Sequence, residues 1–230
     1  GYGNFEELGP YHTNGTPRTS AWTKKANVMF VDNPVGTGYS YVSNSSLLTR
    51  NNQQIASDLL MLLKSVFKTY PDMSAMSFFV FSESYGGKMA ADFALALDAA
   101  VKREEISCNF KGVALGDSWI SPMDSINSWG AFLYNMGFVN SDGEQHIKEA
   151  AAAAQKLVDE GKWEEAADAW GDAVDMTSIA TGGVDFYNVL GNEDDIVLNN
   201  EPMKRMRNLH SISYLTKLMN GIQAQRWNIP

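Results

Sequence analysis

The first 120 residues alternate between short apolar runs and stretches with a helical repeat. In 49–70 apolar residues recur at helical spacing, and Pro71 ends this stretch. A second helix is predicted from about 87 to 103, directly after a short run of small residues. Three apolar runs have the length of buried strands: 28–32, 78–81 and 112–116. Apolar strands without alternation, separated by helices, predict a parallel sheet buried on both faces. The pattern therefore predicts an α/β core.

From about Pro122 onward the pattern indicates helices only. Helical spacing or composition marks three segments: 150–158, 163–174 and 203–219. The alanine run in the first of them is explained by the high helix propensity of alanine. A helical insertion on an α/β core commonly covers an active site. We therefore expect residues 1–121 to form the core and residues 122–230 a mainly helical cap or insertion.

Composition and charge narrow the function classes. The chain has 230 residues, is 44% hydrophobic and carries a formal net charge of −9, so it can bury a substantial core. Without basic blocks it is a poor candidate for nucleic acid binding. No apolar run approaches the ~18 residues of a membrane-spanning helix. Residues 142–201 hold 15 acidic and 3 basic side chains, whereas residues 202–230 hold 5 basic and no acidic ones. We favour a solvated acidic helix face, although the two blocks could also face each other.

The cysteine and histidine content speaks against a metal site. Cys108 is the only cysteine, which excludes an internal disulfide and a cysteine-based metal site. We interpret it as an inert thiol, or as half of a bridge to a segment outside this sequence. His12, His146 and His210 are far apart and show no ligand spacing, and all of them are interpreted as surface or cap residues. We expect no metal and no cofactor.

The segment around Ser84 has the context of a nucleophile elbow. It follows an apolar strand and opens a helix, and small residues, Ser82 and Gly86, stand two positions before and after the serine. Ser82 replaces the usual glycine. The backbone N–H of Tyr85, near the helix N-terminus, is placed to stabilise an oxyanion. Alone, this short pattern is weak, because many strand-to-helix turns contain serine and glycine.

Four longer motifs, in a fixed order along the chain, support the interpretation of this turn as a nucleophile elbow. They are Phe5–Pro10, Asp32–Tyr41, Glu83–Gly87 and Val113–Pro122. Together they resemble the serine carboxypeptidase family of α/β-hydrolases over essentially the whole chain, least clearly in the acidic helical part. The resemblance implies an α/β-hydrolase core with an incomplete parallel sheet and a helical cap insertion. It also implies a peptidase that removes C-terminal residues from peptides or proteins by acyl-enzyme chemistry.

The resemblance assigns roles residue by residue. Ser84 matches the nucleophile, and Tyr85 supplies one oxyanion N–H. Glu7 and Glu83 match paired acids that bind the C-terminal carboxylate of the substrate, sharing a proton to do so. Asn33 and Pro34 match a loop that lines the site. On the residues alone, an ordinary loop acid and an elbow residue making a backbone hydrogen bond would be the simpler interpretation of the two glutamates.

The resemblance also leaves parts of the machinery outside this sequence. A glycine-rich stretch that supplies the second oxyanion N–H would precede it, and the catalytic Asp and His would follow it. We therefore expect a fragment with negligible peptidase activity by itself. Asp117 ends a strand but comes too early in the chain to be the triad acid, so a structural role is favoured. Two other functions stay open: an acyltransferase on the same scaffold, and a non-catalytic binding protein.

Asn14 and Asn44 begin Asn-X-Ser/Thr sequons and are candidate glycosylation sites. Such tripeptides also arise by chance. They are compatible with the secreted or lysosomal and vacuolar setting that the resemblance implies. The sequence does not indicate the oligomeric state.

Overall fold

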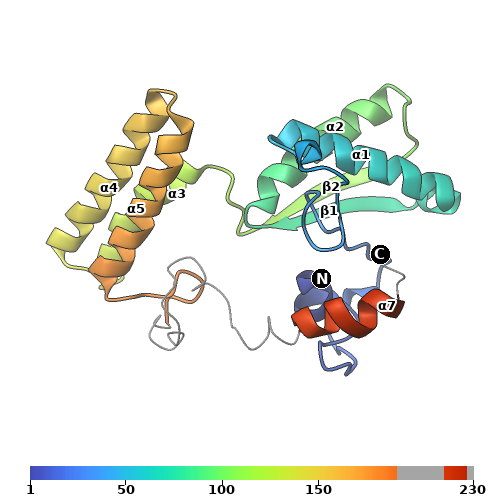
Figure 1. Cartoon of the computed structure of the whole chain (residues 1–230), viewed down its shortest axis with the longest axis horizontal. Coiled ribbons are helices and arrows are strands. Elements are labelled where there is room, and N and C mark those ends of the chain that lie inside the picture. Colours follow the sequence, from blue (N-terminus) through green and yellow to red (C-terminus); the bar gives the residue numbers. More distant parts are fainter. Residues whose placement is uncertain (191–214, 227–230) are drawn as a thin grey trace. The chain divides into compact units, whose positions relative to one another are not determined.

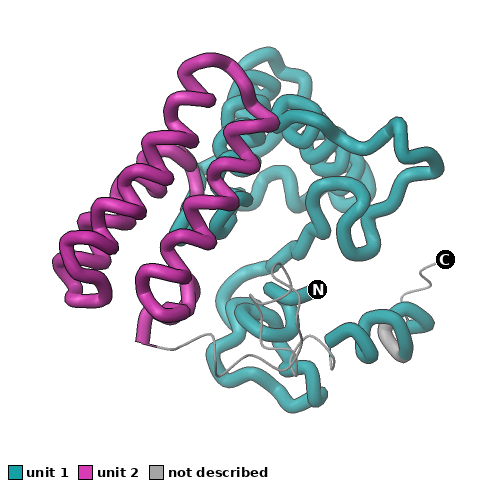
Figure 2. The backbone as a smooth tube through the Cα atoms, turned by 60° about the vertical axis from the view of Figure 1, so that its left-hand side comes forward, with its two compact units in different colours: residues 1–118, 208–230 teal, residues 119–207 magenta. Residues whose placement is uncertain are grey.

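A computed structural model describes residues 1–190 and 215–226 of the chain. It divides into two compact units, coloured separately in Figure 2. Unit 1 comprises residues 1–118 and 208–230, and unit 2 comprises residues 119–207. No described helix is long and apolar enough to cross a membrane.

The sheet of unit 1 consists of β1 (Ser77–Glu83) and β2 (Asn109–Gly116), which pair in parallel. The register runs from Ser77 opposite Asn109 to Glu83 opposite Gly116, with one irregularity after Phe78. Helix α2 (Gly86–Lys102) connects the two strands, as a parallel connection requires. The predicted βαβ arrangement is thus confirmed, and it brings the carboxyl ends of both strands to the same edge.

Helices α1 (Asn52–Thr69) and α2 lie along the sheet (Figure 1). They share a buried cluster that includes Leu63 and Leu97, against which Phe78 and Val80 of β1 pack. Helix α1 begins where Asn51 accepts a hydrogen bond from the N–H of Gln54 (3.0 Å). It ends before η4 (Pro71–Ala75), because a proline cannot continue the hydrogen-bond ladder.

The prediction that the strands are buried on both faces is wrong for β1 and also for β2, in which Val113 is 41% and Leu115 is 42% exposed. Successive side chains of a strand point to opposite faces, so Phe79 and Phe81 point away from the cluster that Phe78 and Val80 join. Phe79 is 52% exposed and Phe81 is 56% exposed. The apolar pattern identifies residues suited to burial but does not show whether another element covers them.

The predicted strand at 28–32 is also absent from the described structure. This segment forms neither a strand nor a helix, and Met29, Phe30 and Val31 are each more than one third exposed. A β-strand needs a hydrogen-bonded neighbour, and the sheet described here contains only β1 and β2. The segment instead lines a cavity together with β1.

Unit 2 is a helical unit formed by α3 (Pro122–Asn135), α4 (Ser141–Asp159) and α5 (Trp163–Thr181). Its buried cluster consists of one isoleucine and small residues: Ile126, Ala151, Ala154 and Ala173. Alanines at the contact permit close helix packing. The predicted helices at 150–158 and 163–174 are confirmed. Most of the predicted helix at 203–219 lies outside the described residues.

Short helical turns complete the described part of unit 1. They are η1 (Gly3–Leu8), η2 (Trp22–Lys24), η3 (Ser45–Leu47), η6 (Met219–Gln223) and α7 (Ala224–Arg226). Of these, η1 matters most for the candidate site, because it carries Glu7.

Candidate active site

Ser84 lies in the turn between β1 and α2, at the carboxyl edge of the sheet, and its side chain is exposed. Its φ is +53°, in the left-handed region that an L-residue other than glycine rarely adopts. The Ser84 N–H donates to the carbonyl of Gly116 at the end of β2 (3.1 Å). The elbow predicted from sequence is therefore present as a strained strand-to-helix turn tied to the neighbouring strand.

The turn needs small residues, as the sequence pattern indicated. A Cβ placed on Gly86 would lie 2.2 Å from Oγ of Ser82. Such a contact is far inside van der Waals distance, so any larger residue at position 86 would displace Ser82. The serine at position 82, where a nucleophile elbow usually has glycine, makes this requirement stricter.

Tyr85 is the residue from which α2 starts. The ammonium of Lys88 lies 4.0 Å from the centre of the Tyr85 ring, which is a cation–π contact. Burial lowers the pKa of Lys88. Sequence reasoning missed this pair, although a spacing of three residues at a helix start is compatible with such a contact.

A cavity of about 1140 Å³ in unit 1 brings together residues from distant segments. Glu7 of η1, Asn33 and Glu83 of β1 all line it, among many apolar side chains. Ser84 follows Glu83 directly. Three of the predicted site residues thus line one cavity beside the turn that carries Ser84. The other two, Pro34 and Tyr85, are not part of its lining.

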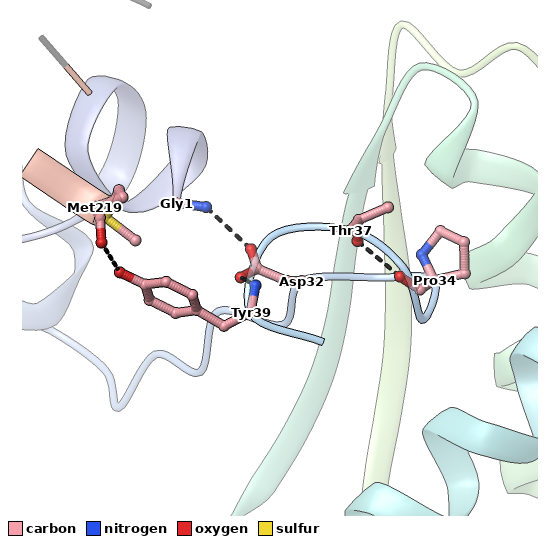
Figure 3. Close-up of polar contacts among 6 residues, drawn as sticks. All are labelled: Gly1, Asp32, Pro34, Thr37, Tyr39 and Met219. Atoms are coloured by element: carbon pink, nitrogen blue, oxygen red, sulfur yellow. Dashed lines mark hydrogen bonds and ion pairs between the residues drawn. The ribbon is translucent and has the colours of Figure 1, made fainter. Parts of the chain in front are cut away.

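Asn33 is held at the cavity wall by α2. Its side-chain Nδ2 donates to the sulfur of Met89 (3.1 Å), and the Asn33–Pro34 peptide bond is cis. A thioether sulfur is a weak acceptor, so this contact leaves the amide readily available to a stronger partner. The carbonyl of Pro34 accepts from Oγ1 of Thr37 (2.7 Å; Figure 3).

The buried side chain of Arg18 holds the segment that carries Glu7. Its Nε donates to the carbonyl of Gly9 (3.1 Å), and a terminal nitrogen donates to the carbonyl of Phe5 (2.5 Å). These carbonyls flank Glu7 on both sides. Sequence reasoning missed Arg18, and no motif around it indicates this role.

The loop after Asn33 is closed by Asp32 (Figure 3). One oxygen of Asp32 accepts from the N–H of Tyr39 (2.9 Å), and the other lies 3.0 Å from the amino group of Gly1. Burial alone would raise the pKa of Asp32, but the Tyr39 hydrogen bond and the Gly1 ammonium outweigh burial and lower it. A Cβ on Gly38 would lie 2.2 Å from Asp32, so the loop can close only over glycine. The Tyr39 hydroxyl donates to the carbonyl of Met219.

The remaining candidates lie away from this cavity lining. Asn14 and Asn44 are exposed, and Oδ1 of each accepts a local backbone N–H. His12 lies in an N-terminal loop, His146 is exposed on α4, and His210 lies outside the described residues. Cys108 is buried.

Taken together, a parallel strand, a strained serine turn and a helix at the sheet edge define a protein of the α/β-hydrolase class. A profile of the serine carboxypeptidase family matches residues 1–226. The chain belongs to the serine carboxypeptidase family.

Individual relatives agree with this assignment. Retinoid-inducible serine carboxypeptidase from Mus musculus is 41% identical over 232 residues, covering 96% of this chain and 51% of that protein. The protein of that name from Homo sapiens is 46% identical over 190 residues, covering 83% of this chain and 42% of that protein. The chain therefore spans about half the length of these relatives.

A solved structure supports the fold. The crystal structure of a prohormone-processing carboxypeptidase from Saccharomyces cerevisiae superposes with a TM-score of 0.77 at 20% identity. The match covers 94% of this chain and 50% of that one. The predicted α/β-hydrolase fold class is thereby confirmed.

Proposed function

We propose that the protein containing this chain is a serine-type carboxypeptidase that releases C-terminal residues from peptides through an acyl-enzyme on Ser84. The observation that carries the proposal is the shared cavity of Glu7, Asn33 and Glu83 beside the serine turn. These residues are distant in sequence, and no packing requirement gathers two acids and an amide at one apolar cavity. Membership of the serine carboxypeptidase family supports the same conclusion.

In this proposal the chain contributes the nucleophile and part of its electrostatic environment. Oγ of Ser84 attacks the carbonyl carbon of the last peptide bond, and its proton passes to a histidine base outside residues 1–230 and then to the leaving amine. Water hydrolyses the resulting ester and frees Ser84. The N–H of Tyr85, at the positive end of α2, stabilises the oxyanion that forms in both steps.

The acids at the cavity provide the preference for a free C-terminus. A carboxyl group that donates a hydrogen bond holds the carboxylate of the substrate, whereas two ionised carboxylates would repel it. Asn33, which lines the same cavity, adds a neutral donor, because in the described part of the chain its Nδ2 donates to the weakly accepting sulfur of Met89. A peptide amide lacks the charge that this arrangement recognises.

The test compares a blocked dipeptide acid with its amide, using the complete protein. Ser84→Ala should abolish turnover of both. Glu83→Gln or Glu7→Gln should change kcat/KM for the acid by about tenfold or more, because a charge-assisted hydrogen bond is altered, and should affect the amide much less. Glu6→Gln, on the same turn η1 but outside the cavity lining, is the matched control.

The outcomes separate this function from its alternatives. Responses of acid and amide that are identical and unchanged by the glutamate substitutions would remove Glu7 and Glu83 from substrate recognition. A Ser84 that resists fluorophosphonate probes in the complete protein would favour a non-catalytic binding protein. Transfer of the acyl group to an added alcohol in preference to water would favour an acyltransferase.

We further propose that the protein enters the secretory pathway, for secretion or for a lysosomal or vacuolar compartment, and carries glycans on Asn14 and Asn44. Both side chains are exposed, so a glycan at either position would extend into solvent. Treatment of the protein from its native host with an endoglycosidase should reduce its apparent mass. Asn14→Gln and Asn44→Gln should each remove one step of that shift.

A further inference from the structure

Three residues other than glycine have a left-handed backbone in the described part of the chain: Ser84, Glu104 and Asp117. Glu104 is explained by a helix end. It follows the last turn of α2, its N–H donates to the carbonyl of Val101 (3.0 Å), and the N–H of Glu105 donates to that of Ala100 (2.9 Å). Helices commonly close in this way on a left-handed residue. Asp117, with φ +33°, follows a strand, and no helix end explains its conformation.

Asp117 lies at the end of β2, the strand to which the backbone of Ser84 is hydrogen-bonded. It is the first residue after β2, whose last residue, Gly116, pairs with Glu83. The Ser84 N–H donates to the carbonyl of Gly116 (3.1 Å). The two left-handed residues at this sheet edge therefore flank one hydrogen bond between neighbouring strand ends.

The geometry of the peptide unit connects the two conformations. A peptide unit is planar, so ψ of Gly116 sets the direction of the Gly116 carbonyl relative to β2, and φ of Asp117 sets the direction in which the chain continues beyond that peptide unit. With φ at +33°, the chain turns away from the sheet while this carbonyl stays directed at Ser84. The turn also brings Oγ of Ser118 back to donate to the Gly116 carbonyl (3.2 Å).

We propose that Asp117 is a positioning residue for Ser84, acting through the Gly116 carbonyl. Its left-handed conformation, and not its charge, carries the role. Its side chain is exposed, and aspartate is one of the few residues other than glycine that tolerate this conformation. The role rests on the proposed function, but it differs from that of a triad acid, because Asp117 acts on Ser84 through the backbone and not on a catalytic base.

The test uses substitutions that separate conformation from charge, made in the complete protein. Asp117→Gly and Asp117→Asn remove the charge and keep access to the left-handed region. Asp117→Val keeps neither, and Asp117→Ala is a milder version of it. The readouts are the rate at which a fluorophosphonate labels Ser84, and kcat and KM for a peptide acid.

We expect Asp117→Val to slow labelling of Ser84 about tenfold, which corresponds to the free-energy cost of placing a β-branched residue in the left-handed region. Asp117→Ala should slow labelling less. The loss should appear in kcat and leave KM nearly unchanged, since Ser84 acts in the chemical step. Asp117→Asn and Asp117→Gly should keep the labelling rate close to that of the wild type.

Glu104 provides the matched control, because it has the same backbone conformation at the far end of α2. Glu104→Val should lower the thermal stability about as much as Asp117→Val, yet leave labelling of Ser84 unchanged. If Glu104→Val slowed labelling of Ser84 as much as Asp117→Val does, the effect of Asp117 would be one of general stability, and the proposal would be overturned.

Two other results would also overturn the proposal. Labelling at the wild-type rate in Asp117→Val would show that the strand end does not position Ser84. An equal loss in Asp117→Asn and Asp117→Val would assign the role to the charge. A wild-type protein that labels at Ser84 but cleaves no peptide would refute the proposed function alone, whereas a wild-type protein that never labels would refute both.

Discussion

The Cys108 thiol illustrates how burial decides the chemistry of a single residue. It lies in the cluster of α1 and α2, and burial raises its pKa to about 11. At about pH 8 only about one molecule in a thousand then carries the reactive thiolate. We predict that a thiol reagent modifies Cys108 far more slowly in the folded chain than in concentrated guanidinium. Free glutathione is the reference, and modification of folded chain at its rate would contradict the prediction.

The contact between Ser82 and position 86 predicts a pairwise effect at the elbow. Gly86→Ala should destabilise the fold by about 1 kcal/mol or more, because the new methyl group meets Oγ of Ser82. Ser82→Gly removes that oxygen, so the double variant should regain most of the loss. Denaturant unfolding of the wild type, both single variants and the double variant measures the coupling. Additive losses would show that Ser82 does not cause the restriction.

The residues of the elbow were predictable from sequence because their requirement is local. A serine between small residues, after an apolar run and before a helix, is compatible with a strained turn, and the longer motifs that resemble a known family identified it as an elbow. The conformation of Asp117 was not predictable, because aspartate fits ordinary backbone equally well and its partner strand is distant in sequence. Arg18 was missed for a similar reason, since its acceptors are backbone carbonyls that leave no sequence signature.

At the scale of elements, the start of α1 depends on a side-chain cap. Oδ1 of Asn51 accepts the N–H of Gln54 (3.0 Å), while Oε1 of Gln54 accepts the N–H of Arg50 (2.7 Å). Asn51→Ala should lower the free energy of unfolding by about 1 kcal/mol. Asn51→Asp should keep most of the stability that the cap provides, because aspartate also accepts this hydrogen bond. Asn52→Ala, one position inside the helix, is the control and should cause no such loss. Equal denaturation midpoints for Asn51→Ala and the wild type would contradict this role.

The elements themselves were predicted with uneven success, for a physical reason. Helices α1 and α5 were predicted from apolar residues at helical spacing. Only residues 150–158 of α4 were predicted, from their alanine content, whereas the helix begins at Ser141. Strand β1 was also predicted from its apolar run. In the structure it pairs directly with β2, the strand that follows the connecting helix α2. Segment 28–32 has an equally apolar run but no ladder partner among the described residues. Periodicity reports what a segment can bury, whereas a strand also requires a neighbour.

At the scale of the molecule, the candidate site depends on segments that local patterns cannot bring together. Glu7, Asn33 and Glu83 come from a short helical turn, a loop and a strand, yet line one cavity. Only the resemblance to a known family related them before the structure did. The same cavity leaves apolar side chains of both 28–32 and β1 partly exposed.

This exposure predicts how the 230-residue chain behaves by itself. Val31 is 37% exposed and Phe79 is 52% exposed, and both line the cavity. Exposed apolar side chains favour association, above all beside strands that have no further ladder partner within residues 1–190 and 215–226. We therefore predict that the isolated chain self-associates as its concentration rises, which sedimentation velocity would detect.

Substitutions at the cavity identify the surface responsible for that association. Val31→Thr combined with Phe79→Thr should shift self-association to higher concentration without lowering the melting temperature much, because both side chains are already partly in water and threonine favours extended backbone. Leu95→Gln is the control: Leu95 is 70% exposed on α2 but does not line the cavity, so its replacement should leave association unchanged. A wild-type chain that stays monomeric with a cooperative melt at high concentration would show that the exposed cavity wall does not drive association.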